Sequence, residues 1–316
     1  MRRRGVCSDG RVSEFQRLGA SRGLDDAAPA APDDRDALRT VAVAVATEAA
    51  AHVRARRPEL FGTDPAGETG AVRTKSTDTD PVTVADTESE DLIRRRLTHL
   101  RPGDGFLGEE RGGDSEVGAH RVRWVVDPID GTVNFVYGIP AFAVSVAAQI
   151  DGCSVAGAVV DVTTGDTYSA ALGAGATLTA ADGTVSSLRC TPVTEVGLAL
   201  VATGFSYDAG RRARQGRLVA ELLPRVRDIR RIGAAALDLC MVAAGRIDAH
   251  YEHGLNPWDW AAGALIAAEA GATVRLPAGF GSGGELTVAV APGIADGFLA
   301  LLSEIGADGP ITTART

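Results

Sequence analysis

The sequence predicts a layered α/β (α+β) protein in which helices cover the faces of β-sheets. Two observations lead to this class. Apolar runs typical of strands are interspersed with helix-like segments along most of the chain. Of the 316 residues, 45% are hydrophobic, so the chain can bury a sizeable core in one or two domains. No internal repeat is evident.

The first third of the chain predicts a leader, two helices and a short strand. Residues 1–34 are rich in Arg, Asp, Ala, Gly and Pro without periodicity, which is typical of disorder. A long helix is expected over 34–57 and a second over 88–100, where Arg101-Pro102-Gly103 closes it. The segment 67–90 between them is polar, and FLGEE (106–110) resembles a short strand that runs into two acids.

The middle of the chain alternates as β-strands do, and its end returns to mixed elements. Turns are expected at Asp151-Gly152 and at Thr164-Gly165-Asp166. Asn256 followed by Pro257 predicts a helix N-cap with proline in the first helical position. The expected strands are 121–127, 141–150, 153–162, 167–173, 198–204, 227–232, 247–252 and 285–292. The expected helices are 211–223, 234–245, 258–272 and 293–306.

Composition excludes several classes of protein. The formal net charge is −9 and the isoelectric point is about 5.1, which argues against nucleic-acid binding and against binding to anionic membranes. The four cysteines are far apart, with no Cys-x-x-Cys and no histidines at ligand spacing. This spacing argues against a zinc site or a disulfide framework and favours a reducing cytoplasm. No apolar stretch follows the basic start before Asp25-Asp26, so no secretory signal is predicted.

Residues 131–150 form a run of 20 residues without a charge, long enough on paper to span a bilayer. The run contains Thr132, Asn134, Gly138, Pro140, Ser145 and Gln149. We interpret it as a turn, a short helix and a buried strand rather than as a membrane span.

The stretch WVVDPIDGTVNF (124–135) holds two acids three residues apart at the end of an apolar run. Asp127 and Asp130 are expected to lie close together, and two like charges in proximity require a positive partner. Glu109 and Asp259 also stand at the ends of apolar elements. Oxygen ligands without cysteine or nearby histidine select hard cations, Mg²⁺ above all, with Mn²⁺ or Ca²⁺ as alternatives. Each acid alone has an ordinary explanation as a turn or surface residue, so the prediction depends on their combination.

Directly after the second acid, Gly131 and Thr132 predict an anion-binding corner built from backbone amides. Metal ions beside a phosphate-sized anion site are suited to hydrolysis of a phosphate ester by activated water. Thr132 is placed to hydrogen-bond that water, and Asp86 in TVADTE is a candidate to accept its proton.

These motifs resemble the inositol monophosphatase family of Mg²⁺-dependent, lithium-sensitive phosphatases. WVVDPIDGTVNF with GIPAFAVSVA is similar to the family's first signature, and PWDWAAGALIAAEAGA (257–272) is similar to the second. LGEE, the segment KSTDTDPVTVADTESE and RRIGAAALDLCMVAAGRIDAHYE match three further family segments. The resemblance extends over about 36–305. It implies an αβαβα layered sandwich of the inositol monophosphatase / fructose-1,6-bisphosphatase type over 35–307, followed by a flexible tail over 308–316, in a cytoplasmic homodimer.

The resemblance also implies roles for particular residues. Two or three Mg²⁺ ions, with Mn²⁺ as a substitute, would be held by Glu109, Asp127, the Ile129 carbonyl, Asp130 and Asp259. Catalytic roles fall to Asp86, Thr132 and Glu109. The substrate would contact Asp130, Gly131, Thr132, Ala235, Glu252 and Asp259. Lys75 would lie on a mobile loop over the site.

The substrate expected from this pattern is inositol-1-phosphate, hydrolysed to myo-inositol and phosphate. Glu252 lies seven residues before Asp259, where inositol-specific members use a carboxylate to accept hydroxyl hydrogen bonds, and Ala235 matches a position that lines the same pocket. His250 departs from relatives that often carry tyrosine, and we interpret His250 and His253 as surface residues or as residues behind the site.

Two alternatives stay open at this point. On the same metal site the substrate could instead be histidinol phosphate or fructose-1,6-bisphosphate. From another class, the chain could act as a regulatory partner of the transcription or RNA machinery, as some bacterial relatives do. The complete set of acids argues for catalysis against this last alternative.

Overall fold

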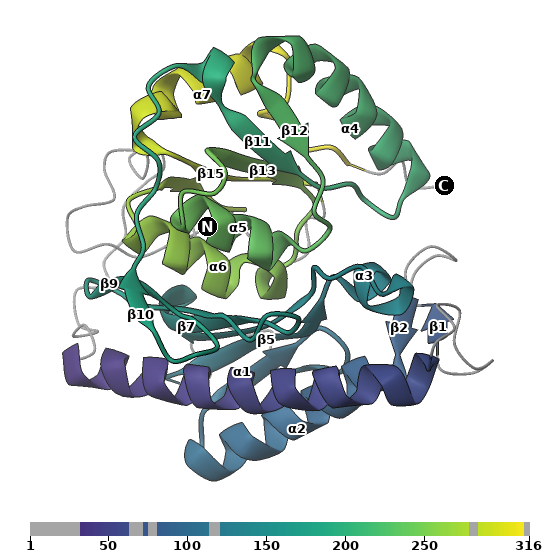
Figure 1. Cartoon of the computed structure of the whole chain (residues 1–316), viewed down its shortest axis with the longest axis vertical. Helices are drawn as coiled ribbons and strands as arrows, with labels where there is room; N and C mark the ends of the chain where they lie inside the picture. Colours follow the sequence, from purple (N-terminus) through teal and green to yellow (C-terminus); the bar gives the residue numbers. More distant parts are fainter. Residues whose placement is uncertain (1–31, 63–71, 75–80, 114–120, 278–283, 313–316) are drawn as a thin grey trace.

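The structure is a computed structural model, and it describes residues 32–62, 72–74, 81–113, 121–277 and 284–312. The leader expected over 1–34 lies almost entirely outside these ranges, and Lys75 lies outside them as well. Within the described part, helices and sheets alternate in five layers (Figure 1). The layered α/β class and the αβαβα arrangement expected from the resemblance are therefore confirmed.

The first two layers are a helical pair and a large sheet. The helices are α1 (Pro32–Phe61) and α2 (Val84–Leu100). The strands are β3 (Gly105–Gly108), β4 (Gly112–Gly113), β5 (Arg123–Asp130), β6 (Ala143–Ile150), β7 (Cys153–Asp161), β8 (Thr167–Ala171), β9 (Gly175–Thr179) and β10 (Val185–Ser187). They pair in the order β10-β9-β8-β7-β6-β5-β3-β4, and β3 runs parallel to β5. Leu38, Ala42, Val45 and Ala49 recur every three or four residues along α1 and are at most 1% exposed, because this stripe packs on β6 and β7.

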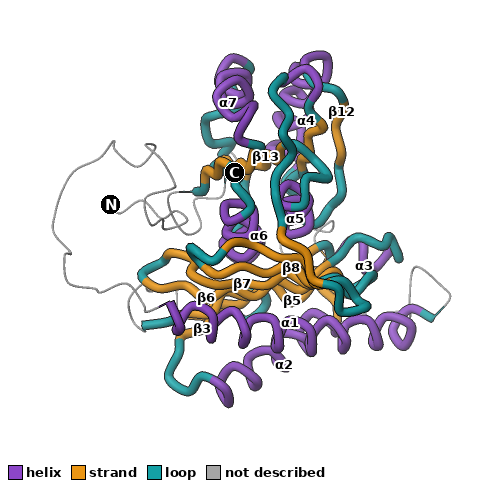
Figure 2. The backbone as a smooth tube through the Cα atoms, turned by 60° about the vertical axis from the view of Figure 1, so that its left-hand side comes forward, coloured by secondary structure: helices purple, strands orange, loops and turns teal. Residues whose placement is uncertain are grey.

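The remaining layers are two central helices, a smaller sheet and two outer helices, and Figure 2 shows the same stacking from another side. The central helices are α5 (Ala235–Ala243) and α6 (Pro257–Glu269), and the outer ones are α4 (Ala209–Leu222) and α7 (Ala295–Glu304). The sheet strands are β11 (Leu200–Thr203), β12 (Asp228–Arg230), β13 (Ala249–His253), β14 (Thr273–Arg275) and β15 (Leu286–Val290), in the order β12-β11-β13-β15-β14. Helices α5 and α6 are buried on nearly every side, as expected for apolar helices between two sheets.

Short elements complete the described part. The two strands β1 (Val72–Thr74) and β2 (Pro81–Thr83) pair with each other, and α3 (Thr132–Tyr137) follows β5. Three 3₁₀ helices are η1 (Val196–Leu198), η2 (Leu223–Arg225) and η3 (Pro292–Ile294). The uncharged run 131–150 forms α3 and the buried strand β6, as interpreted from the sequence.

Local predictions meet mixed outcomes. The Asp151-Gly152 turn is present, with Asp151 at φ 50°, and Asn256 caps α6 with Pro257 in its first turn. The strand expected over 121–127 continues to Asp130 as β5, with an irregularity between Asp127 and Asp130 where the register with β6 shifts. Pro128 has no N–H to donate to the ladder, which explains a bulge at this place.

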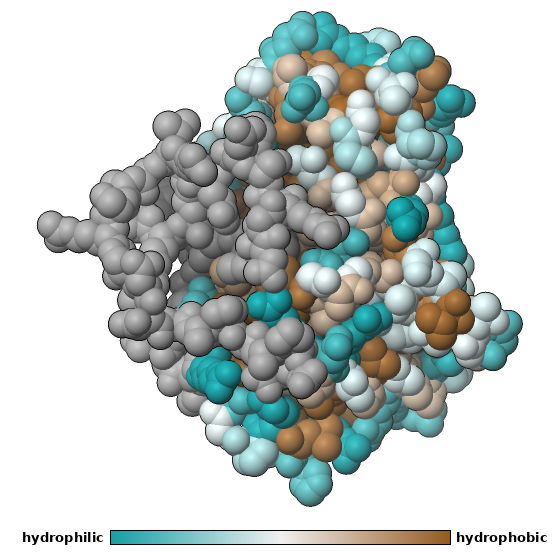
Figure 3. Space-filling model, turned by 90° about the vertical axis from the view of Figure 1, so that its left-hand side faces the viewer, coloured by the Kyte–Doolittle hydropathy of each residue, from teal (hydrophilic) through white to brown (hydrophobic). Residues whose placement is uncertain are grey.

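Cysteine pairing differs from expectation at one position. Cys153 is disulfide-bonded, whereas Cys190 and Cys240 are free thiols. In the described ranges no helix is long and apolar enough to cross a membrane. Hydrophilic and hydrophobic residues intermingle over the described part of the face in Figure 3.

Candidate active site

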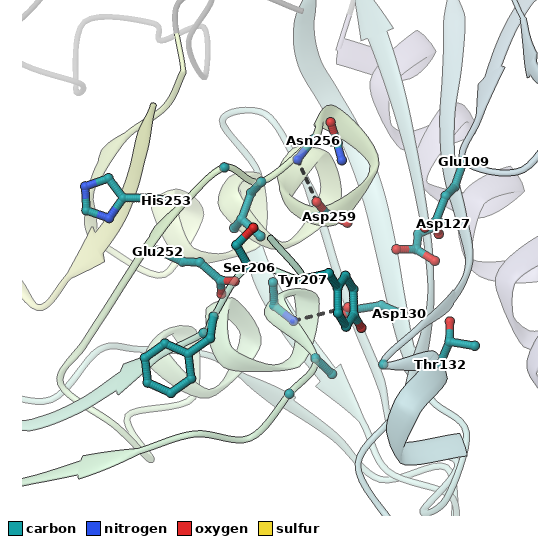
Figure 4. Close-up of a pocket in the computed structure, with 18 of the residues that line it drawn as sticks. Glu109, Asp127, Asp130, Thr132, Ser206, Tyr207, Glu252, His253, Asn256 and Asp259 are labelled. Atoms are coloured by element: carbon teal, nitrogen blue, oxygen red, sulfur yellow. Dashed lines mark hydrogen bonds between the residues drawn. The ribbon is translucent and has the colours of Figure 1, made fainter. Parts of the chain in front are cut away.

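A pocket of about 450 Å³ brings together most of the site residues expected from the sequence. Its size lies in the range of small-molecule sites. It is lined by Glu109, Asp127, Ile129, Asp130, Gly131, Thr132, Ala235, Glu252 and Asp259, among others. Figure 4 shows Glu109, Asp127, Asp130 and Thr132 on one side of this space and Glu252 and Asp259 on elements facing them.

Four helix starts also border the pocket. Its lining includes Gly131, Asp208, Ala234 and Asn256, which are the N-cap residues of α3, α4, α5 and α6. Backbone N–H groups and the positive ends of helix dipoles favour a bound anion. The pocket therefore combines carboxylates, which attract cations, with helix termini, which attract anions.

The acid-bearing bulge of β5 is held by local and distant hydrogen bonds. The Ile129 N–H donates to Asp127 Oδ1 at 3.0 Å, which bends the backbone back over the carboxylate. From α2, the buried Ser89 hydroxyl donates to the Pro128 carbonyl at 3.2 Å. Both acids thus lie at the end of β5 and line the pocket.

Asp130 has a structural partner as well as a place in the pocket. Its carboxylate accepts hydrogen bonds from the N–H groups of Ala235 at 3.2 Å and Ala236 at 2.7 Å. These are first-turn donors of α5, whose N-cap Ala234 has no side chain able to accept them. The carboxylate thereby links the large sheet to a central helix 105 residues later in the chain.

Asp259 likewise takes part in capping a helix, α6. It occupies the third position of that helix, and its Oδ2 accepts from the Asn256 N–H at 2.6 Å in a capping box. The interaction fixes the carboxylate at the start of the helix, beside the pocket.

Glu109 stands on the turn after β3, and a buried glutamate supports that turn. Glu90 Oε2 accepts from the Glu110 N–H at 2.7 Å, and its Oε1 accepts from the Arg111 N–H at 3.1 Å. The side chain of Glu90 is fully buried and also contacts Arg94. A Cβ at Gly108 would lie 2.3 Å from the Glu90 carboxylate, so only glycine leaves room for this arrangement.

Thr132 and Asp86 meet although 46 residues separate them. The Thr132 hydroxyl lies 3.0 Å from Asp86 Oδ1 and 3.0 Å from the Ile129 carbonyl. Asp86 Oδ2 in turn accepts from the Thr83 N–H at 2.8 Å in the capping box of α2. Asp86 is fully buried and does not line the pocket, but its Oδ1 is hydrogen-bonded to Thr132, which does.

The carboxylates disturb one another's protonation. Burial, together with the charge of Glu109, raises the pKa of Asp130 to about 7, although N–H donors of α5 oppose the shift. Burial and the charges of Glu109 and Asp130 raise the pKa of Asp259 well above its ordinary value. Such a cluster is stabilised by a cation.

The donor set suits a hard divalent cation. The carboxylates and the Ile129 carbonyl offer oxygen only, which is the ligand type of Mg²⁺. Within the described ranges, no three His, Cys, Asp or Glu side chains converge closely enough to hold an ion as they stand. The acids share a pocket rather than one point, so binding an ion would require their side chains to draw together.

Glu252 lies across the pocket, at the end of β13. Burial foremost and the charge of Asp130 raise its pKa to about 8, and Arg231 opposes the shift. Arg211, Arg231, Ser206 and Tyr207 also line this side, and the sequence reasoning did not name them. In the sequence, these residues are marked only by their position between β11 and α5. That position predicts a place in the pocket only when the packing of the two sheets is known.

The two histidines that flank Glu252 are not surface residues. His250 is 0% exposed and His253 is 2% exposed. His253 Nε2 lies 2.8 Å from the Ala307 carbonyl, which is a partner in the outer layer. The part of the interpretation that placed these residues on the surface is therefore wrong, because β13 is a central strand buried on both faces.

Comparison with known proteins identifies relatives of the whole described domain. The model of the inositol monophosphatase family matches residues 34–305. An inositol-1-monophosphatase of Mycobacterium leprae (strain TN) is 61% identical over 287 residues, covering 89% of this chain and 98% of the relative. The structure of Mycobacterium tuberculosis SuhB matches with a TM-score of 0.74 and 53% identity, covering 87% of this chain and 99% of that one. The Nus factor SuhB of Vibrio cholerae is 40% identical over 201 residues, which are 63% of this chain and 73% of the relative.

The family match and the high identity to the Mycobacterium leprae relative agree with the fold and with the acids around the pocket. The chain belongs to the inositol monophosphatase family and is an enzyme of the phosphatase class.

Proposed function

We propose that the protein hydrolyses inositol-1-phosphate to myo-inositol and phosphate in a Mg²⁺-dependent reaction. The observation that carries the proposal is the meeting of Glu109, Asp127, Asp130 and Asp259 in one pocket bordered by helix starts. The name of the Mycobacterium leprae relative supports the choice of substrate.

Glu109, Asp127, the Ile129 carbonyl, Asp130 and Asp259 would hold two or three Mg²⁺ ions, for which Mn²⁺ could substitute. When bound, the metal lowers the pKa of a coordinated water and stabilises the negative charge on the departing oxygen. Hydrogen bonds hold the Asp130 and Asp259 carboxylates at the starts of α5 and α6, beside the pocket.

Thr132 and Asp86 would orient the attacking water and receive its proton. The Thr132 oxygen would accept a hydrogen bond from the water while its own proton is donated to Asp86 Oδ1 at 3.0 Å. As the water attacks phosphorus, its proton would pass to Thr132 and that of Thr132 to Asp86, while the bond from phosphorus to the ester oxygen breaks and that oxygen takes a proton from solvent. The Thr83 N–H holds Asp86 in the required orientation.

The phosphate and the polyol would occupy different parts of the pocket. Amides of Gly131 and Thr132 would cradle the phosphate, beside the helix starts that favour an anion. Glu252 would bind the hydroxyl groups, in a part of the pocket that Ala235 also lines, because buried hydroxyls need partners. The expected role of Lys75, over the site, is part of the same proposal.

The first experiment compares phosphate release from inositol-1-phosphate, histidinol phosphate and fructose-1,6-bisphosphate, with Mg²⁺ and with EDTA. A Mg²⁺-dependent preference for the inositol ester supports the proposal. Preference for another ester would retain the metal site and reject the substrate. The variant Asp127→Asn is expected to lose nearly all activity, whereas Glu304→Gln, in an exposed ion pair, serves as control.

The same proposal includes a cytoplasmic homodimer and inhibition by lithium, as expected from the family resemblance. Sedimentation equilibrium tests the dimer, and activity measured against increasing LiCl at fixed Mg²⁺ tests the inhibition. A monomer across the concentration range, or activity unaffected by lithium, would reject the corresponding part.

A second candidate function is regulatory, and the relative called Nus factor SuhB in Vibrio cholerae favours it. In this role the protein would bind a component of the transcription machinery. Pull-down of transcription factors by both the wild type and Asp127→Asn would support a role separate from catalysis. Absence of capture by either protein would reject it.

A further inference from the structure

Behind the pocket, a buried histidine lies between two carboxylates. His250 and Glu252 are two residues apart on β13, so they point to the same face of the sheet. His250 Nε2 is 3.9 Å from Glu252 Oε2, and His250 Nδ1 is 3.6 Å from Asp238 Oδ2 on α5. Of the three side chains, His250 is 0% exposed, Asp238 2% and Glu252 12%.

Three polar atoms in this group lack a hydrogen-bond partner in the described part of the chain. Within the described part of the chain, His250 Nδ1, His250 Nε2 and Asp238 Oδ1 are buried without a hydrogen-bond partner. A buried polar atom left unpaired costs about 1–3 kcal/mol, so three such atoms within reach of one another favour closer pairing. A slight approach would make a continuous chain from Asp238 through His250 to Glu252.

The protonation states fit such a chain. Burial lowers the pKa of His250 to about 3, so the imidazole is neutral at pH 7, with one donor and one acceptor. Burial also raises the pKa of Asp238 well above its ordinary value, and nearby Glu252 and Asp130 add to the rise while Arg231 opposes it. A protonated Asp238 would donate to Nδ1, and the Nε2–H would donate to Glu252.

On the side opposite His250, the Glu252 carboxylate packs directly against a glycine. A Cβ built on Gly204, directly after β11, would lie 2.1 Å from Glu252 Oε2 and 2.2 Å from its Oε1. The backbone at this glycine does not have a positive φ, so alanine would displace the Glu252 carboxylate rather than strain the backbone. Glu252 therefore lies between Gly204 and His250, with the pocket in front of it.

We propose that His250 joins Asp238 to Glu252 and thereby holds the Glu252 carboxylate toward the hydroxyl groups of a polyol phosphate. His250 is then a positioning residue that determines specificity without touching the substrate. The inference rests on the proposed function, because it assigns Glu252 to hydroxyl recognition.

The test compares inositol-1-phosphate with p-nitrophenyl phosphate, which has no hydroxyl groups to recognise. Steady-state kinetics are measured for wild type, His250→Phe, His250→Gln and Gly204→Ala, with thermal unfolding as the control for folding. For His250→Phe, the KM for inositol-1-phosphate is expected to rise about tenfold relative to that for p-nitrophenyl phosphate, the effect of one hydrogen bond. His250→Gln keeps a donor and an acceptor and is expected to recover most of the loss.

Gly204→Ala is the independent arm, since it displaces Glu252 from the other side without altering His250. A selective rise in KM in this variant supports the role of Glu252 in hydroxyl recognition, and His250→Gln tests the histidine where His250→Phe fails to fold. Equal changes for both substrates, or no change in either, would overturn the inference while leaving the proposed function intact. A wild type that hydrolyses p-nitrophenyl phosphate but not inositol-1-phosphate would overturn the proposed substrate and the inference with it.

Discussion

Asp130 Oδ2 accepts a hydrogen bond of 2.7 Å from the Ala236 N–H, and this bond joins the acid-bearing bulge of β5 to the first turn of α5. The carboxylate therefore has two duties, one in the pocket and one as a cap that the sequence of α5 does not supply itself. The two roles of Asp130 can be tested separately. Its role as a helix cap is tested by stability without metal, and its role in the pocket is tested by activity with metal.

Asp130→Ala is expected to be less stable than Asp130→Asn by about 1 kcal/mol in EDTA, because asparagine keeps an acceptor for the α5 amides and alanine does not. Urea unfolding followed by circular dichroism measures the difference. Both variants are expected to lose nearly all Mg²⁺-dependent phosphatase activity. Equal stability of the two would show that the cap contributes nothing.

Glu252 makes the stability of the metal-free protein depend on pH. Its pKa is raised from 4.5 to about 8 in the folded state, chiefly by burial. Between these values the folded state holds a proton that the unfolded chain releases, so the free energy of unfolding falls as pH rises through this window. Melting temperatures in EDTA from pH 5 to 9 should therefore decline less steeply for Glu252→Gln than for wild type.

The exposed carboxylate of Glu48, on α1, offers a control for this measurement. Glu48→Gln is expected to follow the wild-type pH dependence. Parallel curves for wild type and Glu252→Gln would mean that Glu252 is not shifted in the folded protein.

Glu90 is expected to raise the Mg²⁺ affinity of the site by holding the turn that carries Glu109. Glu90→Gln weakens the two hydrogen bonds that hold the Glu110 and Arg111 amides, since one amide oxygen replaces two carboxylate oxygens. The turn that carries Glu109 would then be less fixed, and Mg²⁺ affinity is expected to fall about tenfold, as for other residues that orient metal ligands. Isothermal titration calorimetry with MgCl₂ gives the affinity without reference to activity.

Glu88→Gln is the matched control, because Glu88 lies on the same helix but forms a partly exposed ion pair with Arg56. Its Mg²⁺ affinity should equal that of wild type. A Glu90→Gln protein that binds Mg²⁺ as tightly as Glu88→Gln would limit Glu90 to a structural role.

The layered fold and the pocket acids could be predicted from sequence because their signals are local. Asp127-Pro-Ile-Asp130 and Asn256-Pro257 are short motifs whose geometry depends on neighbouring residues. The supporting contacts could not be predicted, because they join distant segments: Glu90 reaches the turn 20 residues later, and Asp130 reaches α5. The sequence left a surface position and a position behind the site both open for His250, because the strands that flank β13 come from distant segments.

Variants of Thr132 and Asp86 test whether these two residues act as a unit. The hydroxyl of Thr132, which lines the pocket, lies 3.0 Å from Asp86 Oδ1, so we expect the two residues to act on water together. Thr132→Ala and Asp86→Asn are each expected to lower kcat about 10²-fold or more, with a smaller change in KM. The double variant should lose little beyond either single one, because residues that act as a unit are not additive. Thr132→Ser keeps the hydroxyl and should retain most of the activity, whereas a strictly multiplicative loss in the double variant would show that the two residues act independently.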